Sequence, residues 1–248
     1  EFEIELLDIE QLNQRLFSGG FDVAKCSFHA AIRMAESIYV MPTGSALGFG
    51  VGPLLLASQP EVVPESTSQL TLCPGELTTA TLLYNLFYPS KTRLEHVVFS
   101  DIMPSLSSRR ADFGVCIHEG RFTWQQEGLA LVEDLGSRWE RETECPLPLG
   151  GLVGDRALPT TLLQNVNQII QDSLQLARSN PEATLPTMRR YAQEFDDEVL
   201  MKHVELYVND WTIDLGDQGA NSLAQLAQKS ADAGILEPSQ KVLEILPS

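Results

Sequence analysis

The sequence has no uninterrupted apolar run that reaches the ~18 residues of a membrane-spanning helix. Basic residues are also few, with 17 Lys and Arg against 34 Asp and Glu, so the formal net charge is −17. Two adjacent basic pairs occur, Arg109-Arg110 and Arg189-Arg190, but they do not make the basic cluster that a nucleic-acid site needs. We therefore expect neither a membrane span nor a nucleic-acid partner.

Cysteine is scarce and widely spaced. The four cysteines are Cys26, Cys73, Cys116 and Cys145, and no two of them form a C-x-x-C zinc or redox motif. The first three lie in or next to apolar runs, where cysteine usually behaves as a small hydrophobic residue. This pattern predicts reduced thiols and a cytoplasmic protein.

What the sequence does contain is a regular alternation of strand-like and helix-like segments. Its 248 residues, 43% of them hydrophobic, are enough for one large domain or two smaller ones. The predicted strands are 2–7, 21–24, 38–41, 54–57, 69–73, 96–99, 113–117 and 129–134, and a return connection at 146–153 enters another. The predicted helices are 9–17 with Asp8 as N-cap, 27–34, 78–88, 104–110 and 135–141, and the chain is helical from residue 159 onward. We therefore predict an α/β fold.

The order of these segments predicts two halves. Residues 1–67 and 148–248 would form one discontinuous α/β domain, with residues 68–147 inserted as a second. Two crossings between the halves imply a cleft, and ligands favour clefts between domains. Four segments at strand ends could meet there, namely 25–27, the glycine-rich loop 42–53, 78–80 and 118–121.

The segment from Ala111 to Trp124 concentrates reactive side chains. A short apolar run, 113–117, has the length of a strand buried on both faces, and His118, Glu119, Gly120 and Arg121 follow it directly. Ligands of open α/β sheets bind at the carboxyl ends of strands, and an imidazole there titrates near neutral pH. The alternative is structural: a hydrogen-bonded histidine, a turn glycine and an arginine paired with an acid.

Two other segments offer groups that bind anions, whereas the glycine-rich loop matches no phosphate-binding motif. Ser27 precedes a predicted helix, whose first amides lack partners, and Lys25 adds a positive charge beside it. Thr78 and Thr79 lie at a second helix start, where they could hold a carboxylate or hydroxyl or simply cap the helix. The glycine-rich loop lacks the G-K-[ST] ending of a phosphate-binding loop and the later glycine of a dinucleotide fingerprint.

Six motifs, taken together and in order, cover almost the whole chain. They are K-C-S-F-H-A (25–30), S-A-L-G-F-G-V-G-P-L (45–54), T-T-A (78–80), I-H-E-G-R-F-T-W (117–124), P-L-P-L-G-G (146–151) and H-V-E-L-Y-V-N (203–209). In these the sequence resembles the 1,4-dihydroxy-6-naphthoate synthases of the futalosine route to menaquinone. That family has the two-domain fold of type II periplasmic binding proteins, with a cleft between the domains.

The resemblance implies a carbon–carbon lyase that acts on cyclic dehypoxanthinyl futalosine. His118 matches the family's general base, and the matching substrate-binding residues are Lys25, Cys26, Ser27, Thr79 and Ala80. The resemblance implies no metal and no nicotinamide cofactor. The family's opening strand, with a loop of the S-P-C-P-N-D-T type, does not occur in this sequence, and Phe49 stands where some relatives have a polar or basic residue. We therefore expect an incomplete half-sheet and altered ligand contacts near residue 49.

Two other functions fit the same fold. A non-catalytic solute-binding protein would need hydrogen-bond donors and shape but no base at position 118. Chorismate dehydratase, a second enzyme of the same pathway and fold, would give a product of different mass. The sequence leaves the oligomeric state open.

Overall fold

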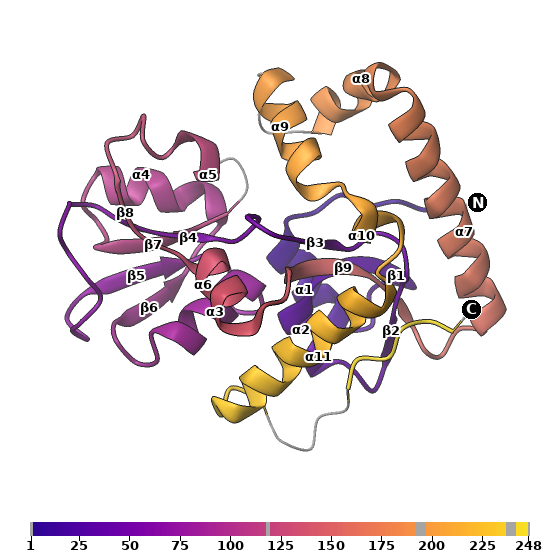
Figure 1. Cartoon of the computed structure of the whole chain (residues 1–248), viewed down its shortest axis with the longest axis horizontal. Coiled ribbons are helices and arrows are strands. Elements are labelled where there is room, and N and C mark those ends of the chain that lie inside the picture. The colour runs from indigo at the N-terminus through magenta and orange to yellow at the C-terminus, as the bar shows by residue number, and fades with distance from the viewer. Residues whose placement is uncertain (1, 118–119, 192–196, 237–241, 248) are drawn as a thin grey trace.

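The computed structural model describes residues 2–117, 120–191, 197–236 and 242–247, which form two lobes side by side (Figure 1). The sheet of the first lobe is built around the nine-residue strand β9 (Leu147–Asp155). Strand β1 (Val23–Ser27) pairs with β9 along one edge, and β2 (Ile38–Val40) and β3 (Ala46–Gly48) also pair with it, all antiparallel. The glycine-rich loop thus contains a short strand that the sequence did not predict.

The second lobe holds a five-stranded sheet. Its order is β6 (Arg93–His96), β5 (Leu70–Cys73), β7 (Phe113–Cys116), β4 (Leu54–Ala57) and β8 (Ala130–Asp134). Strands β5, β6 and β7 are parallel, whereas β4 runs antiparallel to both of its neighbours. The carboxyl ends of β5, β6 and β7 therefore share one edge of the sheet.

Strand β4 was predicted with the first half of the chain, but it belongs to the second sheet. All four of its residues are buried, and they pair with β7 on one side and β8 on the other. A continuous apolar run of this kind suits a central strand. The polar segment 59–68 is therefore a loop within the second lobe. The division of the chain into two domains, with this strand reassigned, stays a prediction.

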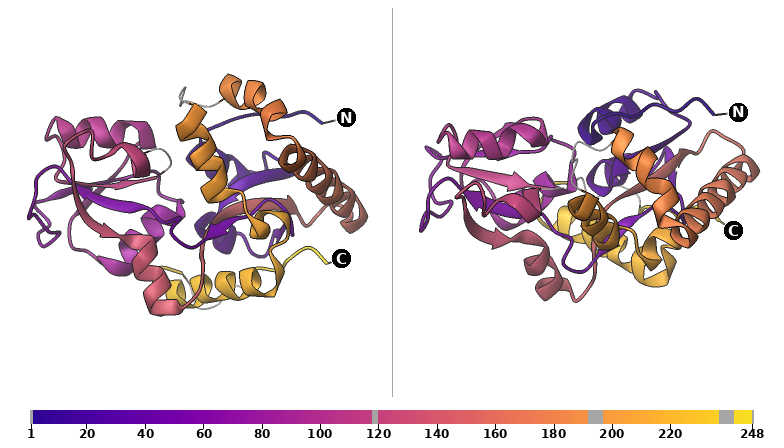
Figure 2. Two further views of the ribbon diagram at one scale, coloured as in Figure 1. Left: turned by 45° about the horizontal axis from the view of Figure 1, so that its top comes forward. Right: turned by 90° about the horizontal axis from the view of Figure 1, so that it is seen from above.

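Helices cover both sheets (Figures 1 and 2). Those of the first lobe are α1 (Ile9–Phe17), α2 (Phe28–Arg33), α7 (Thr160–Ser179), α8 (Pro181–Tyr191), α9 (Asp197–Tyr207), α10 (Asp210–Ile213) and α11 (Gly216–Asp232). Those of the second lobe are α3 (Thr79–Phe87), α4 (Ile102–Ser107), α5 (Gly120–Thr123) and α6 (Leu135–Thr143). None of the described helices is both long enough and apolar enough to cross a membrane.

Two predicted strands were wrong. Residues 2–7 pair with no strand of the described chain, and Phe2, Ile4 and Leu6 are exposed, so the alternating pattern has no sheet to pack against. The strand predicted at 96–99 lies at 93–96 instead, because parallel pairing aligns Arg93 with Leu70 of β5. That strand is at the sheet edge and is mostly exposed, so it lacks the apolar pattern on which the prediction relied.

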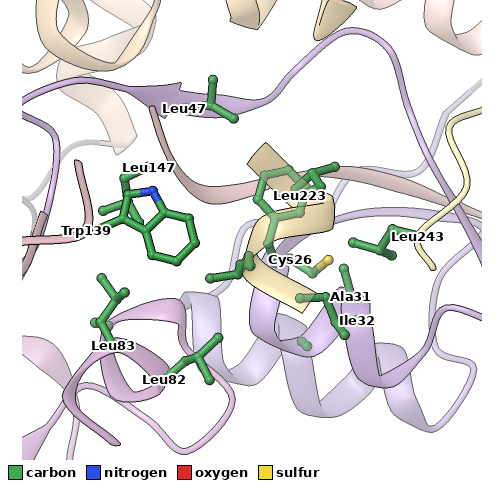
Figure 3. Packing of buried hydrophobic residues seen from close by; sticks show 14 of the residues in the cluster. Cys26, Ala31, Ile32, Leu47, Leu82, Leu83, Trp139, Leu147, Leu223 and Leu243 are labelled. Atoms are coloured by element: carbon green, nitrogen blue, oxygen red, sulfur yellow. The ribbon is translucent and has the colours of Figure 1, made fainter. Parts of the chain in front are cut away.

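One hydrophobic core joins the two lobes. Trp139 of α6, Leu83 of α3, Leu147 of β9 and Leu223 of α11 belong to a single buried cluster, and Figure 3 shows these side chains in the interior. Trp139 and Leu83 are fully buried. Shared burial of this kind fixes the position of one lobe relative to the other.

The crossing from β3 to β4 passes very close to the start of α6. A Cβ atom on Gly52 would lie 2.2 Å from the Cα atom of Gly136. The amide of Leu135 donates to the carbonyl of Pro53 at 3.0 Å, and the guanidinium of Arg121 donates to the carbonyl of Gly52 and pairs with Asp134. Glycine is therefore required at residue 52 for the backbones to approach this closely.

Gly52→Ala should accordingly lower the free energy of unfolding by about 3 kcal/mol, the upper end of the usual cost of overpacking. Urea unfolding followed by tryptophan fluorescence measures this change. Gly128→Ala is the matched control, because its methyl group would enter open space at φ +67° and cost only roughly 1 kcal/mol of backbone strain. Equal stability of the two variants would contradict the close approach.

Candidate active site

A cavity of about 580 Å³ lies between the two sheets and has walls from both. Its described lining residues are Leu6, Leu7, Asp8, Ile9, Gln11, Leu12, Lys25, Cys26, Ser27, Ala46, Val51, Gly52, Pro53, Thr78, Thr79, Ala80, Val98, Phe99, Ile117, Leu149, Gly150, His203 and Tyr207. Most of these residues are apolar, and a small number of polar groups lie among them. This composition is typical of a small-molecule site.

The second lobe contributes the ends of its parallel strands. Thr78 to Ala80 follow β5, Val98 and Phe99 follow β6, and Ile117 follows β7. This is the edge of an open α/β sheet at which ligands bind. The amides of Thr79 and Ala80 begin helix α3, where backbone N–H groups lack intrahelical partners and attract anions.

The first lobe contributes the end of β1. Side chains alternate along a strand, so Lys25 is exposed to the cavity while Cys26 points into the core and has no exposed surface. Although Lys25 is exposed to the cavity, the protein around it reduces its contact with water. This desolvation lowers the pKa of its ammonium group. Burial raises the pKa of the Cys26 thiol to about 12, so this thiol is not a nucleophile at neutral pH.

Ser27 is held by helix α1. The side-chain amide of Asn13 donates to the Ser27 hydroxyl at 3.1 Å, and its oxygen accepts from the Ser27 backbone amide at 2.9 Å. Ser27 is the N-cap residue of α2, as predicted, but its side chain does not cap that helix. Asn13 therefore positions the end of β1 in the cavity wall.

Thr79 connects three elements that line or support the cavity. Its hydroxyl donates to the carbonyl of Leu149 on β9 at 2.7 Å and accepts from the backbone amide of His29 on α2 at 3.3 Å. The Nδ1 atom of His29 lies 3.2 Å from the carbonyl of Thr78, which makes it the donor. These bonds occupy the Thr79 hydroxyl, so we expect this residue to meet a ligand through its backbone amide.

The structure brings five of the six predicted site residues to one cavity: Lys25, Cys26, Ser27, Thr79 and Ala80 all belong to its lining. The sixth, His118, lies outside the described residues, as does Glu119. Their chain neighbour Ile117 lines the cavity. The roles of all six residues in binding and catalysis stay predictions.

Arg121 and Phe49 do not belong to the described lining of the cavity. Arg121 forms an ion pair with Asp134, 2.8 Å long, in agreement with the structural interpretation of this arginine. The ring of Phe49 is 49% exposed and contacts Trp211 edge to face, and Phe49 does not belong to the cavity lining.

Helix α9 supplies two lining residues to which the sequence assigned no role. His203 and Tyr207 lie one helical turn apart, with ring centroids 4.6 Å apart, and both face the cavity. Desolvation and the charge of Lys25 lower the pKa of His203. The only sign of their role in the sequence was their presence in the H-V-E-L-Y-V-N motif. Because they are far from Lys25 along the chain, the sequence does not show that all three residues line one cavity.

Comparison with known proteins identifies the family. A family model described as "Menaquinone biosynthesis" matches residues 1–232. The chain belongs to this family. A 1,4-dihydroxy-6-naphtoate synthase from Thermus thermophilus is 35% identical over 238 residues, covering 96% of this chain and 86% of the relative. A protein of the same name from Streptomyces coelicolor is 32% identical over 239 residues, covering 94% and 84%. The predicted place in menaquinone biosynthesis is thereby confirmed.

Solved structures place this member of the menaquinone biosynthesis family in a wider fold. A crystal structure of an Archaeoglobus fulgidus protein matches with a TM-score of 0.87 and 27% identity, covering 93% of this chain and 86% of that one. The periplasmic aliphatic sulphonate binding protein SsuA from Escherichia coli matches with a TM-score of 0.65 and 10% identity, covering 99% and 81%. The predicted fold class, an α/β fold like that of the periplasmic binding proteins, is confirmed.

The hydrogen bonds of Thr79 predict a stability effect. Thr79→Val should lower the free energy of unfolding by about 1–3 kcal/mol, because a buried carbonyl and a buried amide lose their partner. Thr79→Ser keeps the hydroxyl and should stay closer to wild type. Chemical denaturation of the two variants in parallel tests this, and a valine variant as stable as the serine variant would contradict the bonding described above.

The burial of His29 predicts a pH effect. Desolvation and the charge of Arg33 lower the pKa of His29 to about 4. Because protonation is easier in the unfolded chain, the stability contributed by neutral His29 is present above pH ~6.5 and is lost as pH falls toward 4, a change of about 3 kcal/mol. His29→Asn keeps a donor toward Thr78 but does not titrate. Its unfolding free energy should therefore fall less than that of wild type over this range, and parallel pH profiles would contradict the assignment.

Proposed function

We propose that the protein is a 1,4-dihydroxy-6-naphthoate synthase, a carbon–carbon lyase that converts cyclic dehypoxanthinyl futalosine to 1,4-dihydroxy-6-naphthoate and a sugar-derived fragment. The observation that carries this proposal is that two segments matching the synthase motifs, 25–27 and 78–80, line one cavity. Relatives that carry the synthase name are 32–35% identical over nearly the whole chain.

The cavity suits a substrate that is partly aromatic and partly charged. Leu6, Leu12, Phe99 and Leu149 offer apolar surface to a ring system, and Lys25 offers a positive charge. Lys25, Cys26, Ser27, Thr79 and Ala80 would form the binding wall, with the α3 amides as hydrogen-bond donors.

The proposed base is His118. Removal of a proton from the sugar-derived part would start a retro-aldol-like cleavage, and formation of the aromatic naphthalene ring would make that cleavage favourable. An imidazole is suited to this step, because its pKa lies near the working pH. The position of its neighbour Ile117 in the cavity lining supports the assignment.

The enzyme is favoured over a non-catalytic solute-binding protein. The similarity to SsuA, at 10% identity, extends to the fold alone, whereas the synthases match at the level of sequence. We also propose that the enzyme acts in the cytoplasm. Its four cysteines are free and buried, which fits a reducing compartment.

A product assay tests the proposal. The wild-type protein, incubated with cyclic dehypoxanthinyl futalosine, should release 1,4-dihydroxy-6-naphthoate, detected by mass. His118→Ala should lower kcat by about 10² or more, the usual contribution of a general base, while product binding persists. His96→Ala, which changes an exposed histidine on β6, serves as the control. Turnover by His118→Ala at the wild-type rate would exclude the proposed base, and a folded wild-type protein without turnover would exclude the function.

A further inference from the structure

Helix α1 of the first lobe contacts the second lobe through the side chain of Glu10. Its carboxylate accepts the backbone amide of Leu77, at 3.1 Å from Oε2 and 3.3 Å from Oε1. Leu77 directly precedes Thr78, the N-cap residue of α3, and the first residues of that helix line the cavity. The contact therefore joins α1 to the helix start at which we expect a ligand to bind.

The turn that leads into α3 is shaped around this carboxylate. Gly75 has φ +100°, and a Cβ atom on it would lie 2.5 Å from Oε2 of Glu10. Both the positive φ and the close approach require glycine. The carbonyl of Gly75 accepts the hydroxyls of Thr78 at 3.1 Å and Thr81 at 2.5 Å. Because the turn is bonded to the first residues of α3 in this way, a shift of the turn would also shift the helix start.

The same carboxylate is linked to the end of β1. The side-chain amide of Asn13, one turn after Glu10 on α1, donates to Oε2 of Glu10 at 3.4 Å and to the Ser27 hydroxyl at 3.1 Å. The carbonyl oxygen of Asn13 accepts the backbone amide of Ser27 at 2.9 Å. Both N–H donors and the oxygen of this amide are thus in use. A continuous chain of hydrogen bonds therefore runs through α1 from Leu77 in one lobe to Ser27 in the other.

The bonds of Glu10 require an acceptor at both of its oxygens. Oε1 accepts the side-chain amide of Gln14 at 3.2 Å in addition to the amide of Leu77, and Oε2 accepts from Leu77 and Asn13. Each of these described partners is a donor, and an ionised carboxylate accepts at both oxygens without offering a competing N–H. Glu10 does not belong to the described lining of the cavity, so it can act on a ligand through the groups that it holds.

We propose that Glu10 is a positioning residue, which holds the start of α3 in one lobe against the end of β1 in the other so that both segments meet the same ligand. Loss of this contact would let the amides of Thr79 and Ala80 move relative to Ser27, and misplaced binding groups bind less well. The inference rests on the proposed function for the identity of the natural ligand. The contact itself concerns any ligand that touches both segments.

Three substitutions at residue 10 separate the reach of the side chain from its charge. Glu10→Gln keeps the length and one oxygen for the amide of Leu77. Glu10→Asp keeps the negative charge in the first turn of α1 but is one methylene group too short, and Glu10→Ala keeps neither. A positioning role predicts that glutamine replaces glutamate best. A role of the charge at the helix N-terminus alone predicts instead that aspartate does.

Two measurements follow the expected order. In the turnover assay, KM should rise about tenfold in Glu10→Ala and Glu10→Asp and about threefold or less in Glu10→Gln, with kcat within about threefold of wild type. Hydrogen exchange of the segment 75–80, followed by mass spectrometry, should be about tenfold faster in the alanine and aspartate variants, while exchange of β7 is unchanged.

Glu142→Ala is the matched control, because Glu142 also joins the lobes. Its carboxylate on α6 accepts the guanidinium of Arg138 at 2.9 Å and pairs with Lys229 of α11 at 3.6 Å, and it is not part of the described cavity lining. This variant loses a bond between the lobes and should leave KM and the exchange of segment 75–80 unchanged. If KM rises as much in Glu142→Ala as in Glu10→Ala, the inference is overturned, because any weakening between the lobes would then have the same effect.

Binding of 2-naphthoate, an aromatic carboxylate, gives a reading that needs no turnover. Its Kd, measured by calorimetry on the full chain, should rise in the same order as KM. If that order is found but wild type does not convert cyclic dehypoxanthinyl futalosine, the proposed function fails and the inference holds. If turnover is normal and neither KM nor exchange depends on residue 10, or if exchange changes and KM does not, the inference fails alone. A wild type that neither turns over the substrate nor binds 2-naphthoate would overturn both.

Discussion

The hydroxyl of Thr79 is the contact on which the arrangement of the cavity depends most directly. It joins the start of α3 to β9 and, through the amide of His29, to α2. These three elements belong to both lobes, and two of them, α3 and β9, contribute residues to the cavity lining. A buried hydroxyl with both its donor and its acceptor engaged holds such a junction more tightly than apolar packing alone, because breaking it leaves polar groups unpaired.

The shared core gives this junction a fixed frame. Trp139 and Leu83 from the second lobe pack with Leu147 and Leu223 from the first, so the lobes meet through a dense interior. The crossing at Gly52 adds a backbone contact with Gly136 that tolerates no side chain. Together these features place the strand ends of one lobe in the same cavity wall as Lys25 of the other.

Much of this arrangement was accessible from the sequence, because it depends on local patterns. Apolar runs located β4, β5 and β7, and Asp8 marked the start of α1, where its carboxylate accepts the amide of Glu10. The rule that ligands bind at carboxyl strand ends located Thr79 and Ala80. The sheet to which a strand belongs was harder to predict, because an apolar run such as 54–57 does not reveal which strands pair with it. The position of His203 was inaccessible, because no local pattern reports that α9 lines the same cavity as β1.

The position of β9 has a consequence for the order in which the molecule can form during synthesis. The second sheet is drawn from residues 54–134, whereas β1 must wait for β9, at residues 147–155, before it has a partner in the first sheet. A chain leaving the ribosome can therefore complete its inserted lobe while the N-terminal segment is still unpaired. The cavity closes only after α9 emerges, so a ligand can stabilise the finished protein but cannot guide the early stages of its folding.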